Sequence, residues 1–234
     1  MPNWCGNVLT IQGESEALDA LETAVKGSDD NGSPLDFSLE AIAPTPEALK
    51  GRGPKSFSPV EIERMRSQFD AWKHSIGEER LREMIEHAEN QYADDPQYDA
   101  LTAEYGSDNW YDWRFKHWGT KWELDGVQRK RAPGSDLLHY TFATAWSPPK
   151  PAIELLSGRF PTLFFHLNYE ESGADIAGCI AYRAGRRVMW SDGSWASAIT
   201  GAYAFRRELL ALGKDDEDDD DLLDQVYSAL SRDM

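Results

Sequence analysis

The sequence predicts an α+β fold in which one antiparallel sheet carries helices on one of its faces. A β-α-β pattern begins the chain, and a second one follows residue 122. In both, runs with the period of a strand flank an amphipathic helix. Two such halves that share one sheet form the ferredoxin-like arrangement. We expect residues 1–234 to form a single α+β domain whose sheet core comprises residues 1–43 and 122–189.

The first half contains the clearest periodicity. Residues 4–11 are predicted to form a strand, and residues 15–25 a helix with its leucines on one face. Residues 35–42 are predicted to form a second strand, because Leu35 and Phe37 alternate with polar residues.

Residues 44–121 are predicted to be a mostly helical insertion with a tryptophan-rich end. The predicted helices cover residues 59–73, 78–93 and 96–105. Ser58 is placed to cap the first of them, because a proline and a glutamate follow at the positions of a capping box.

The second half repeats the pattern of the first. A hairpin of strands is predicted, then a helix that Ser147 caps, then two more strands; the ranges are 123–131, 137–146, 147–159, 163–170 and 176–184. Residues 190–234 are predicted to be a helical, acidic extension, with a helix at 200–212 and a short amphipathic segment at 222–230.

Composition limits the class of protein. The 234 residues are 41% hydrophobic and carry a formal charge of −17, so a core is expected and generic binding to double-stranded DNA is disfavoured. No apolar run is long enough to span a membrane, and the chain begins without a signal peptide, which predicts a cytoplasmic protein. Cys5 and Cys179 are expected to be two buried thiols in strands.

Four blocks of the sequence resemble one family. They are MPNWCGNVLTIQG at residues 1–13, IAPTPE at 42–47, WYDW to WGTKW at 110–122, and TAWSPP at 144–149. These blocks are similar to those of the YubB-like, Api-type proteins of phages and conjugative plasmids, and they span most of the chain.

The resemblance implies a ferredoxin-like domain in a mobile-element protein of the bacterial cytoplasm. It implies no enzymatic activity. The name of the fold describes topology alone, because two distant cysteines cannot hold an iron–sulfur cluster.

An aromatic segment provides the first candidate binding site. Its indoles recur at helical spacing, which usually indicates packing against a sheet. The alternative is a stacking surface for a small molecule or a single nucleic-acid strand, with cations beside exposed rings. The candidate binding residues are Trp110, Trp113, Trp118, Lys121, Trp122 and Trp146. Trp4, Asn7, Lys121 and Trp146 come from separate family-like blocks, so the four are expected to meet in space around a shared polar feature or to brace the sheet edge.

Histidines and acids on neighbouring predicted strands provide a weaker candidate. His166 and Glu170 are expected on one face of a strand, with His139 and Glu171 nearby. A zinc ion usually takes three or four protein ligands, so no metal or cofactor is expected. No phosphate loop, nucleophile elbow or zincin helix occurs, and the chain is therefore predicted not to be an enzyme.

Charged runs provide the last candidates. Two short segments are basic: residues 129–131, and Arg186 with Arg187. They are expected either to bind an anion locally or to pair with neighbouring acids. An acidic interaction surface is predicted from exposed acids of the insertion and of the run at 215–221: Glu78, Glu79, Glu83, Glu86, Asp215, Asp216, Asp218 and Asp219.

The leading hypothesis is an accessory protein that binds a basic bacterial host protein through this acidic surface, as an inhibitor of host defence does when it mimics DNA. A small-molecule or single-strand binder that uses the tryptophans is the alternative. A hydrolase at His166 and Glu170 is a third hypothesis. The oligomeric state stays open.

Overall fold

A computed structural model describes residues 3–93, 95–171, 173 and 176–193 of the chain. Their main feature is a six-stranded antiparallel sheet with the order β4-β5-β1-β6-β7-β8. Its strands are β1 (Trp4–Gln12), β4 (Asp125–Lys130), β5 (Leu137–Ala145), β6 (Phe164–Glu171), β7 (Ile176–Arg183) and β8 (Arg186–Gly193).

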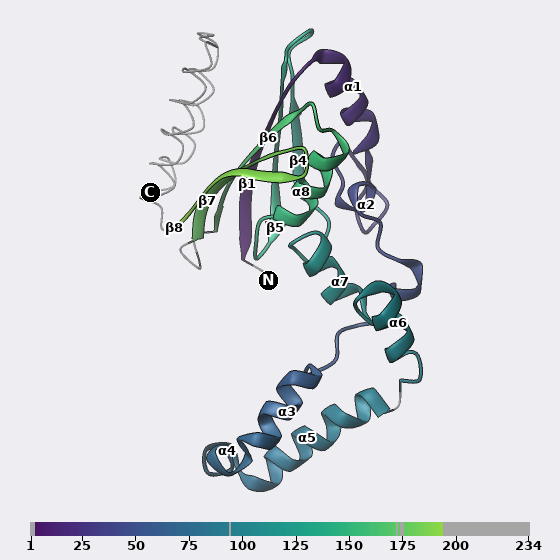
Figure 1. Ribbon diagram of the computed structural model, residues 1–234, viewed down its shortest axis with the longest axis vertical. Helices are drawn as coiled ribbons and strands as arrows, with labels where there is room; N and C mark the ends of the chain where they lie inside the picture. Colours follow the sequence, from purple (N-terminus) through teal and green to yellow (C-terminus); the bar gives the residue numbers. More distant parts are fainter. Residues whose placement is uncertain (1–2, 94, 172, 174–175, 194–234) are drawn as a thin grey trace.

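The core lies between this sheet and two helices, α1 (Ser15–Ala24) and α8 (Lys150–Arg159) (Figure 1). Strand β1 lies between β5 and β6 and is antiparallel to both. Alternate β1 residues such as Leu9 and Ile11 are fully buried with the leucines of α1, as the period of a strand requires. The predicted α+β, ferredoxin-like class is confirmed, with β7 and β8 extending the sheet beyond β6.

The strand predicted at residues 35–42 is wrong. Only a short ladder forms there, between β2 (Gly27–Ser28) and β3 (Pro34–Leu35), and α2 (Leu39–Ile42) follows. Ser38 caps α2 by accepting a hydrogen bond from the backbone N–H of Ala41. The alternating apolar residues therefore reach the core from a turn and a helix and not from a strand. In the sheet, β4 occupies the place of the strand that was predicted here.

Helices fill most of the insertion, close to the predicted ranges. The first predicted helix divides at Gln68 into two. The segments are η1 (Glu47–Leu49), α3 (Pro59–Ser67), α4 (Phe69–Ile76), α5 (Glu78–Ala93), α6 (Tyr98–Tyr105) and α7 (Trp110–His117). The Ser58 capping box is present.

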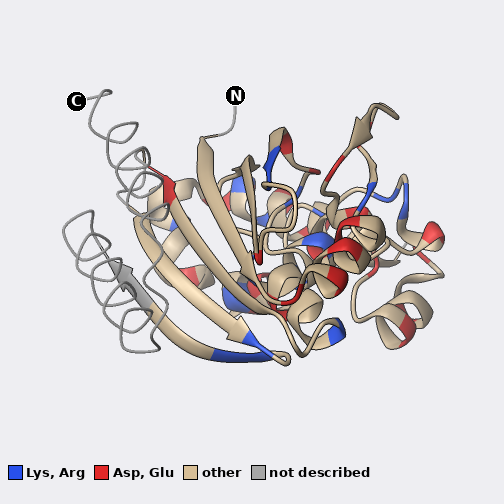
Figure 2. Ribbon diagram, turned by 90° about the horizontal axis from the view of Figure 1, so that it is seen from above, with Lys and Arg blue, Asp and Glu red and all other residues tan. Residues whose placement is uncertain are grey.

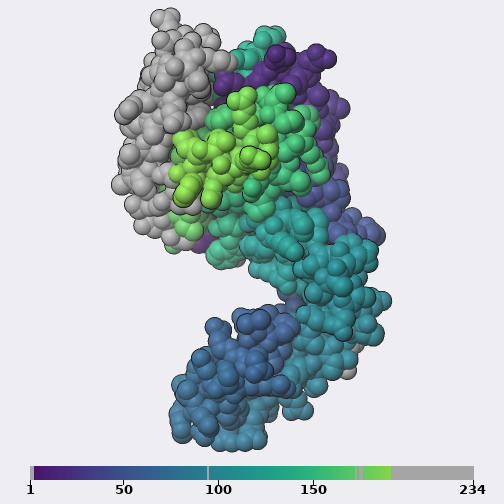
Figure 3. Space-filling view, in the orientation of Figure 1, coloured from purple at the N-terminus to yellow at the C-terminus, as the bar shows by residue number. Residues whose placement is uncertain are grey.

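Helices α3, α4 and α5 form a helical lobe that extends away from the sheet, with a concave side between lobe and body (Figures 1 and 3). The lobe has its own small core, which includes Ile62, Met65 and Leu81. Such a core explains how the lobe holds its shape while it projects into solvent.

Two chain segments join the lobe to the body through a neck of charged residues: Arg52, Lys55, Asp95 and Asp108. The Lys55 ammonium pairs with Asp108 and lies 2.9 Å from Asp95, which also pairs with Arg52. The Arg52 Nε donates to the backbone carbonyl of Asp108 at 2.7 Å. The neck therefore ties the ends of the lobe to each other.

Helix α8 begins at Lys150 and not at the position that a Ser147 cap predicts. The Ser147 hydroxyl donates instead to the carbonyl of Gly119, at 2.5 Å. Gly119 has φ +88, and an added Cβ would lie 2.9 Å from the Pro148 carbonyl oxygen, so only glycine fits where the two segments meet.

Both cysteines are buried in strands, as expected, and burial raises the pKa of Cys5 to about 12. Within the described ranges, no helix is long and apolar enough to cross a membrane. The predicted helix at 200–212, the segment at 222–230 and the acidic run at 215–221 lie outside the described residues.

Candidate functional site

Three tryptophans and one lysine meet where β1 begins and β5 ends. Trp4 opposes Ala145 across the ladder, and the backbone N–H of Trp146 donates to the Asn3 carbonyl at 3.0 Å. The Trp4 and Trp122 rings lie 6.3 Å apart between centroids. With Lys121, these residues (Trp4, Trp122, Trp146) form what we call the tryptophan surface.

Lys121 occupies the centre of this surface. Its ammonium lies 4.1 Å from the ring centroid of Trp122 and 5.8 Å from that of Trp146, within the range of cation–π attraction. The preceding residue, Thr120, donates its hydroxyl to the Ala145 carbonyl at 2.8 Å and so fixes this loop to the end of β5. No carboxylate of the described residues forms an ion pair with Lys121.

The tryptophan surface is exposed to solvent, and one of its residues has an unusual backbone conformation. Trp4 is 43% exposed and Trp146 is 44% exposed, although indole rings are normally well covered. Trp146 also has φ +72, in the left-handed region that a bulky residue rarely adopts. Strain of this kind is found where the surrounding structure enforces it, often at binding sites.

A hollow of about 320 Å³ adjoins the tryptophan surface through Trp122. Its deepest cation is Arg114, whose guanidinium lies 4.2 Å from the ring centroid of buried Trp118 and 5.4 Å from that of Trp110. Arg114 pairs with Asp30 at 3.0 Å. The complete lining is Asp30, Thr45, Lys50, Gly51, Trp110, Arg114 and Trp122.

Two of the six candidate binding residues belong to the core, which corrects their assignment to a binding surface. Trp113 is 7% exposed and Trp118 is fully buried, with its indole N–H donating to the Ala43 carbonyl at 2.7 Å. A buried indole with a satisfied N–H stabilises the fold. Trp110, Trp122, Lys121 and Trp146 do lie on or beside the surface.

Asn7 does not join Trp4 on the surface. Its side chain is buried on the helix-facing side of β1, where its amide donates to the Cys5 carbonyl at 2.8 Å and to the Thr144 hydroxyl at 2.9 Å. Asn7 therefore braces the pairing of β1 with β5.

The histidines and acids of the strands do not form a metal site. No group of three or more potential ligands occurs among the described residues. His166 is buried, and burial lowers its pKa to about 4. Glu170 lies on the same face as His166, as the strand period requires, and His139 contacts the Thr10 hydroxyl at 3.1 Å.

The acids predicted on the insertion are exposed on α5. Glu78 pairs with Arg82 at 2.6 Å, whereas Glu79, Glu83 and Glu86 form no ion pair within the described part of the chain. Acidic and basic segments are interspersed over the helices, and the strands carry few charges along most of their length (Figure 2). The four acids at 215–219 lie outside the described residues.

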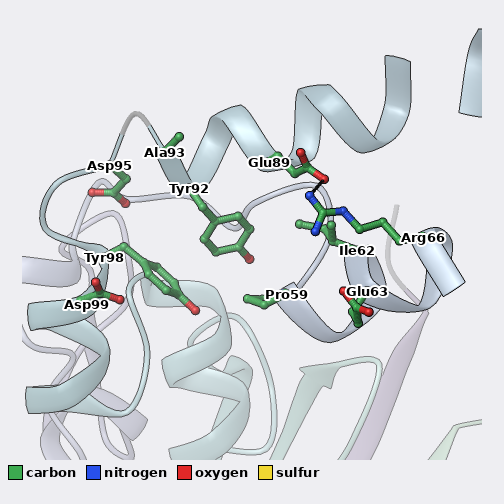
Figure 4. Close-up of a pocket in the computed structure, with 10 residues that line it drawn as sticks. All are labelled: Pro59, Ile62, Glu63, Arg66, Glu89, Tyr92, Ala93, Asp95, Tyr98 and Asp99. Atoms are coloured by element: carbon green, nitrogen blue, oxygen red, sulfur yellow. Dashed lines mark ion pairs between the residues drawn. The ribbon is translucent and has the colours of Figure 1, made fainter. Parts of the chain in front are cut away.

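A second pocket, of about 480 Å³, lies between the helical lobe and the start of α6 (Figure 4). Rings of Tyr92 and Tyr98 meet edge to face there, 4.7 Å apart, and the Lys55 ammonium of the neck lies 4.8 and 4.9 Å from their centroids. These rings thus already hold a cation of the chain itself. The lining is Pro59, Ile62, Glu63, Arg66, Glu89, Tyr92, Ala93, Asp95, Tyr98 and Asp99.

Sequence reasoning missed two parts of the candidate site. Trp4 was grouped with Lys121 and Trp146 but is absent from the six candidate binding residues, and Arg114 is absent from them too. The signal for Arg114 is its position one turn before Trp118, which places a guanidinium over an indole on the same helix.

The comparison with family models agrees with this topology. Residues 117–224 match the model of the ferredoxin-like domain in Api92-like proteins. The crystal structure of the protein api92 from Yersinia pseudotuberculosis is similar over 83% of this chain and 98% of that chain, with 13% sequence identity and a TM-score of 0.44. No curated protein matches the sequence.

Proposed function

We propose that this chain is a non-enzymatic accessory protein that binds a protein partner through the tryptophan surface. The observation that carries the proposal is the exposure of Trp4 and Trp146 around the ammonium of Lys121, which pairs with no acid of the described ranges. Tryptophan dominates the residues whose truncation weakens protein interfaces most, because its large ring becomes dry on binding.

The chemistry of the surface specifies the partner. Indole faces favour an apolar or aromatic side chain, and the Lys121 ammonium favours a carboxylate at the centre of the contact. The partner we propose therefore presents an apolar residue beside an acid. The match to the Api92-like model supports an Api-type protein, and a bacterial host of a phage or plasmid is the proposed setting, in the cytoplasm.

Affinity capture with matched variants tests the proposal. A partner that binds the wild-type chain from bacterial lysate should be lost with Trp4→Ala and with Trp122→Ala. It should be kept by Val60→Ala, which shortens an exposed apolar side chain of the helical lobe. With the purified partner, calorimetry should show a loss of affinity of about 30-fold or more for each tryptophan.

Two results would count against this proposal. Equal capture by the tryptophan variants and the wild type places the interface elsewhere. Quenching of tryptophan fluorescence by nucleotides or short single strands, abolished by Trp122→Ala, assigns the surface to a small planar anion instead.

The acidic face of α5 is a second candidate for partner binding. Glu79, Glu83 and Glu86 are exposed, follow helical spacing and lack ion pairs among the described residues. Their arrangement favours a basic host protein, such as a nuclease of a defence system that an acidic surface inhibits by resembling DNA.

Neutralising these three acids tests the second candidate. The triple glutamine variant should weaken capture of a basic partner, most strongly at low salt, because exposed charges are screened. Replacing Glu78, which Arg82 already neutralises, by glutamine is the control. Undiminished capture by the triple variant would exclude α5 from the interface.

A further inference from the structure

The turn between β7 and β8 presents cations in a chain that is otherwise strongly acidic. Arg183 opposes Arg186 across the ladder, and Arg187 opposes Tyr182. All three arginines are exposed, and blue segments flank the turn on both strands (Figure 2). Arg159, at the end of α8, adjoins the turn. We call these four residues the arginine corner.

The arginine corner differs from the other basic run of the sequence. Arg129 pairs with Glu22, and Arg131 pairs with Glu22 at 2.7 Å and with Asp19 at 2.5 Å, so these cations balance acids of α1. In the described part of the chain, none of the four arginines of the corner forms an ion pair. No acid of the described residues therefore neutralises their guanidinium groups.

The backbone holds the corner in a defined shape. Ala184 and Gly185 both have positive φ, as in the two-residue turns that suit a twisted hairpin. The Gly185 N–H donates to the Ser157 hydroxyl of α8 at 3.1 Å. A Cβ on Gly185 would lie 3.3 Å from the Gly158 Cα, so the turn packs directly on the end of α8, next to Arg159.

An aromatic ring completes the corner. Trp190 on β8 is 58% exposed, and the Arg187 guanidinium lies 4.3 Å from its ring centroid. Val188 between them is also exposed. Guanidinium groups bind phosphate oxygens in pairs of hydrogen bonds, and an exposed indole stacks on a base. These are the two groups that one strand of nucleic acid presents together.

We propose that the arginine corner binds single-stranded nucleic acid that passes over the tip of the hairpin, with phosphates on Arg183 and Arg186 at one face and, at the other face, a phosphate on Arg187 and an unpaired base on Trp190. A duplex hides the faces of its bases and cannot stack on the indole. The site is short, because the net charge of the whole chain, −17, repels a long phosphate backbone. This site is separate from the tryptophan surface and does not depend on the function proposed for that surface.

Fluorescence anisotropy with labelled oligo-thymidine and oligo-adenine strands tests the proposal on the full chain. Binding should weaken with salt, with a slope of the logarithms near −2 for about three phosphates. R186A/R187A should lower affinity about tenfold or more and reduce the magnitude of that slope by about 1.4. Trp190→Ala should lower affinity roughly tenfold with the slope unchanged.

Arg80→Ala is the matched control. Arg80 is also an exposed arginine without an ion pair among the described residues, but it lies in the helical lobe. Circular dichroism should show that every variant keeps the fold, since all the altered side chains are exposed.

Three outcomes would overturn the proposal. The first is no binding of either strand at low salt. The second is equal loss of affinity in Arg80→Ala and R186A/R187A, which shows a diffuse charge effect. The third is binding to duplexes or to anionic phospholipid vesicles that matches or exceeds binding to single strands and does not require Trp190.

Discussion

Replacing Glu123 provides the sharpest test of how the body is held together. This carboxylate is buried between the loop before β4 and the start of α2. It accepts hydrogen bonds from the backbone N–H groups of Leu39 at 2.7 Å and Glu40 at 2.9 Å, and from the Ser38 hydroxyl at 3.0 Å. A third backbone N–H, that of Leu124, also donates to it.

Glu123→Ala removes the acceptor and leaves these buried donors without partners. Each of the four unsatisfied donors costs about 1–3 kcal/mol, so the free energy of unfolding should fall by about 4 kcal/mol or more. That is a large fraction of the roughly 5–15 kcal/mol that stabilises a typical domain. Glu123→Gln keeps one acceptor oxygen and should lose less.

Urea unfolding followed by circular dichroism measures the effect. The midpoint should fall for Glu123→Ala with an unchanged slope, because the same surface is exposed on unfolding. Asp125→Ala is the control, since Asp125 is a nearby acid that is exposed on β4. A loss below about 1 kcal/mol for Glu123→Ala would refute the proposed role of this carboxylate.

Four further predictions concern other parts of the molecule. Burial lowers the pKa of His166 from 6.5 to about 4, so the unfolded chain binds the proton more readily than the folded chain does. The free energy of unfolding should therefore fall by about 2 kcal/mol between about pH 7 and pH 5. Urea unfolding of His166→Gln should lack this contribution to the pH dependence. Trp118→Phe loses the bond to Ala43 and some packing and should cost about 2–3 kcal/mol in the same assay, whereas an unchanged midpoint would contradict its core role. Lys55→Met leaves the poorly exposed Asp108 without its ion pair and Asp95 with Arg52 alone, and should make the neck more sensitive to limited proteolysis; Lys73→Met, which breaks an ion pair with the exposed Asp70, is the control. Because of its positive φ, Trp146→Gly should be about 1 kcal/mol more stable than Trp146→Ala, and the opposite order would show that the site carries no backbone strain.

The sequence predicted the elements with regular periodicity and the α+β class, because period 2 and period 3.6 report directly which side chains are buried. It failed at residues 35–42, where Glu123 and Ser38 supply the hydrogen bonds that start a helix. A carboxylate that lies far along the chain leaves no local signal, so tertiary contacts overrode the alternating pattern.

The candidate site shows the same limit. The sequence pattern identified the tryptophans as one group of candidates. It did not distinguish Trp118, which is buried in the core, from Trp146, which is exposed. Likewise, Arg131 and Arg186 look alike in sequence. The acids of α1 that neutralise Arg131 become visible only when α1 is placed beside β4.

The neck also affects how the chain folds. Strand β1 pairs with β5, which begins at Leu137, so the central ladder closes a very long loop. Such non-local pairing slows folding, because the entropy of closing the loop is lost before the contacts form. The helical lobe, with its own small core, closes its ends at Arg52 and Asp108. A lobe that forms early shortens the loop that remains between β1 and β5. Cutting the chain within α4 should then slow refolding of the sheet, although the cut lies outside the sheet.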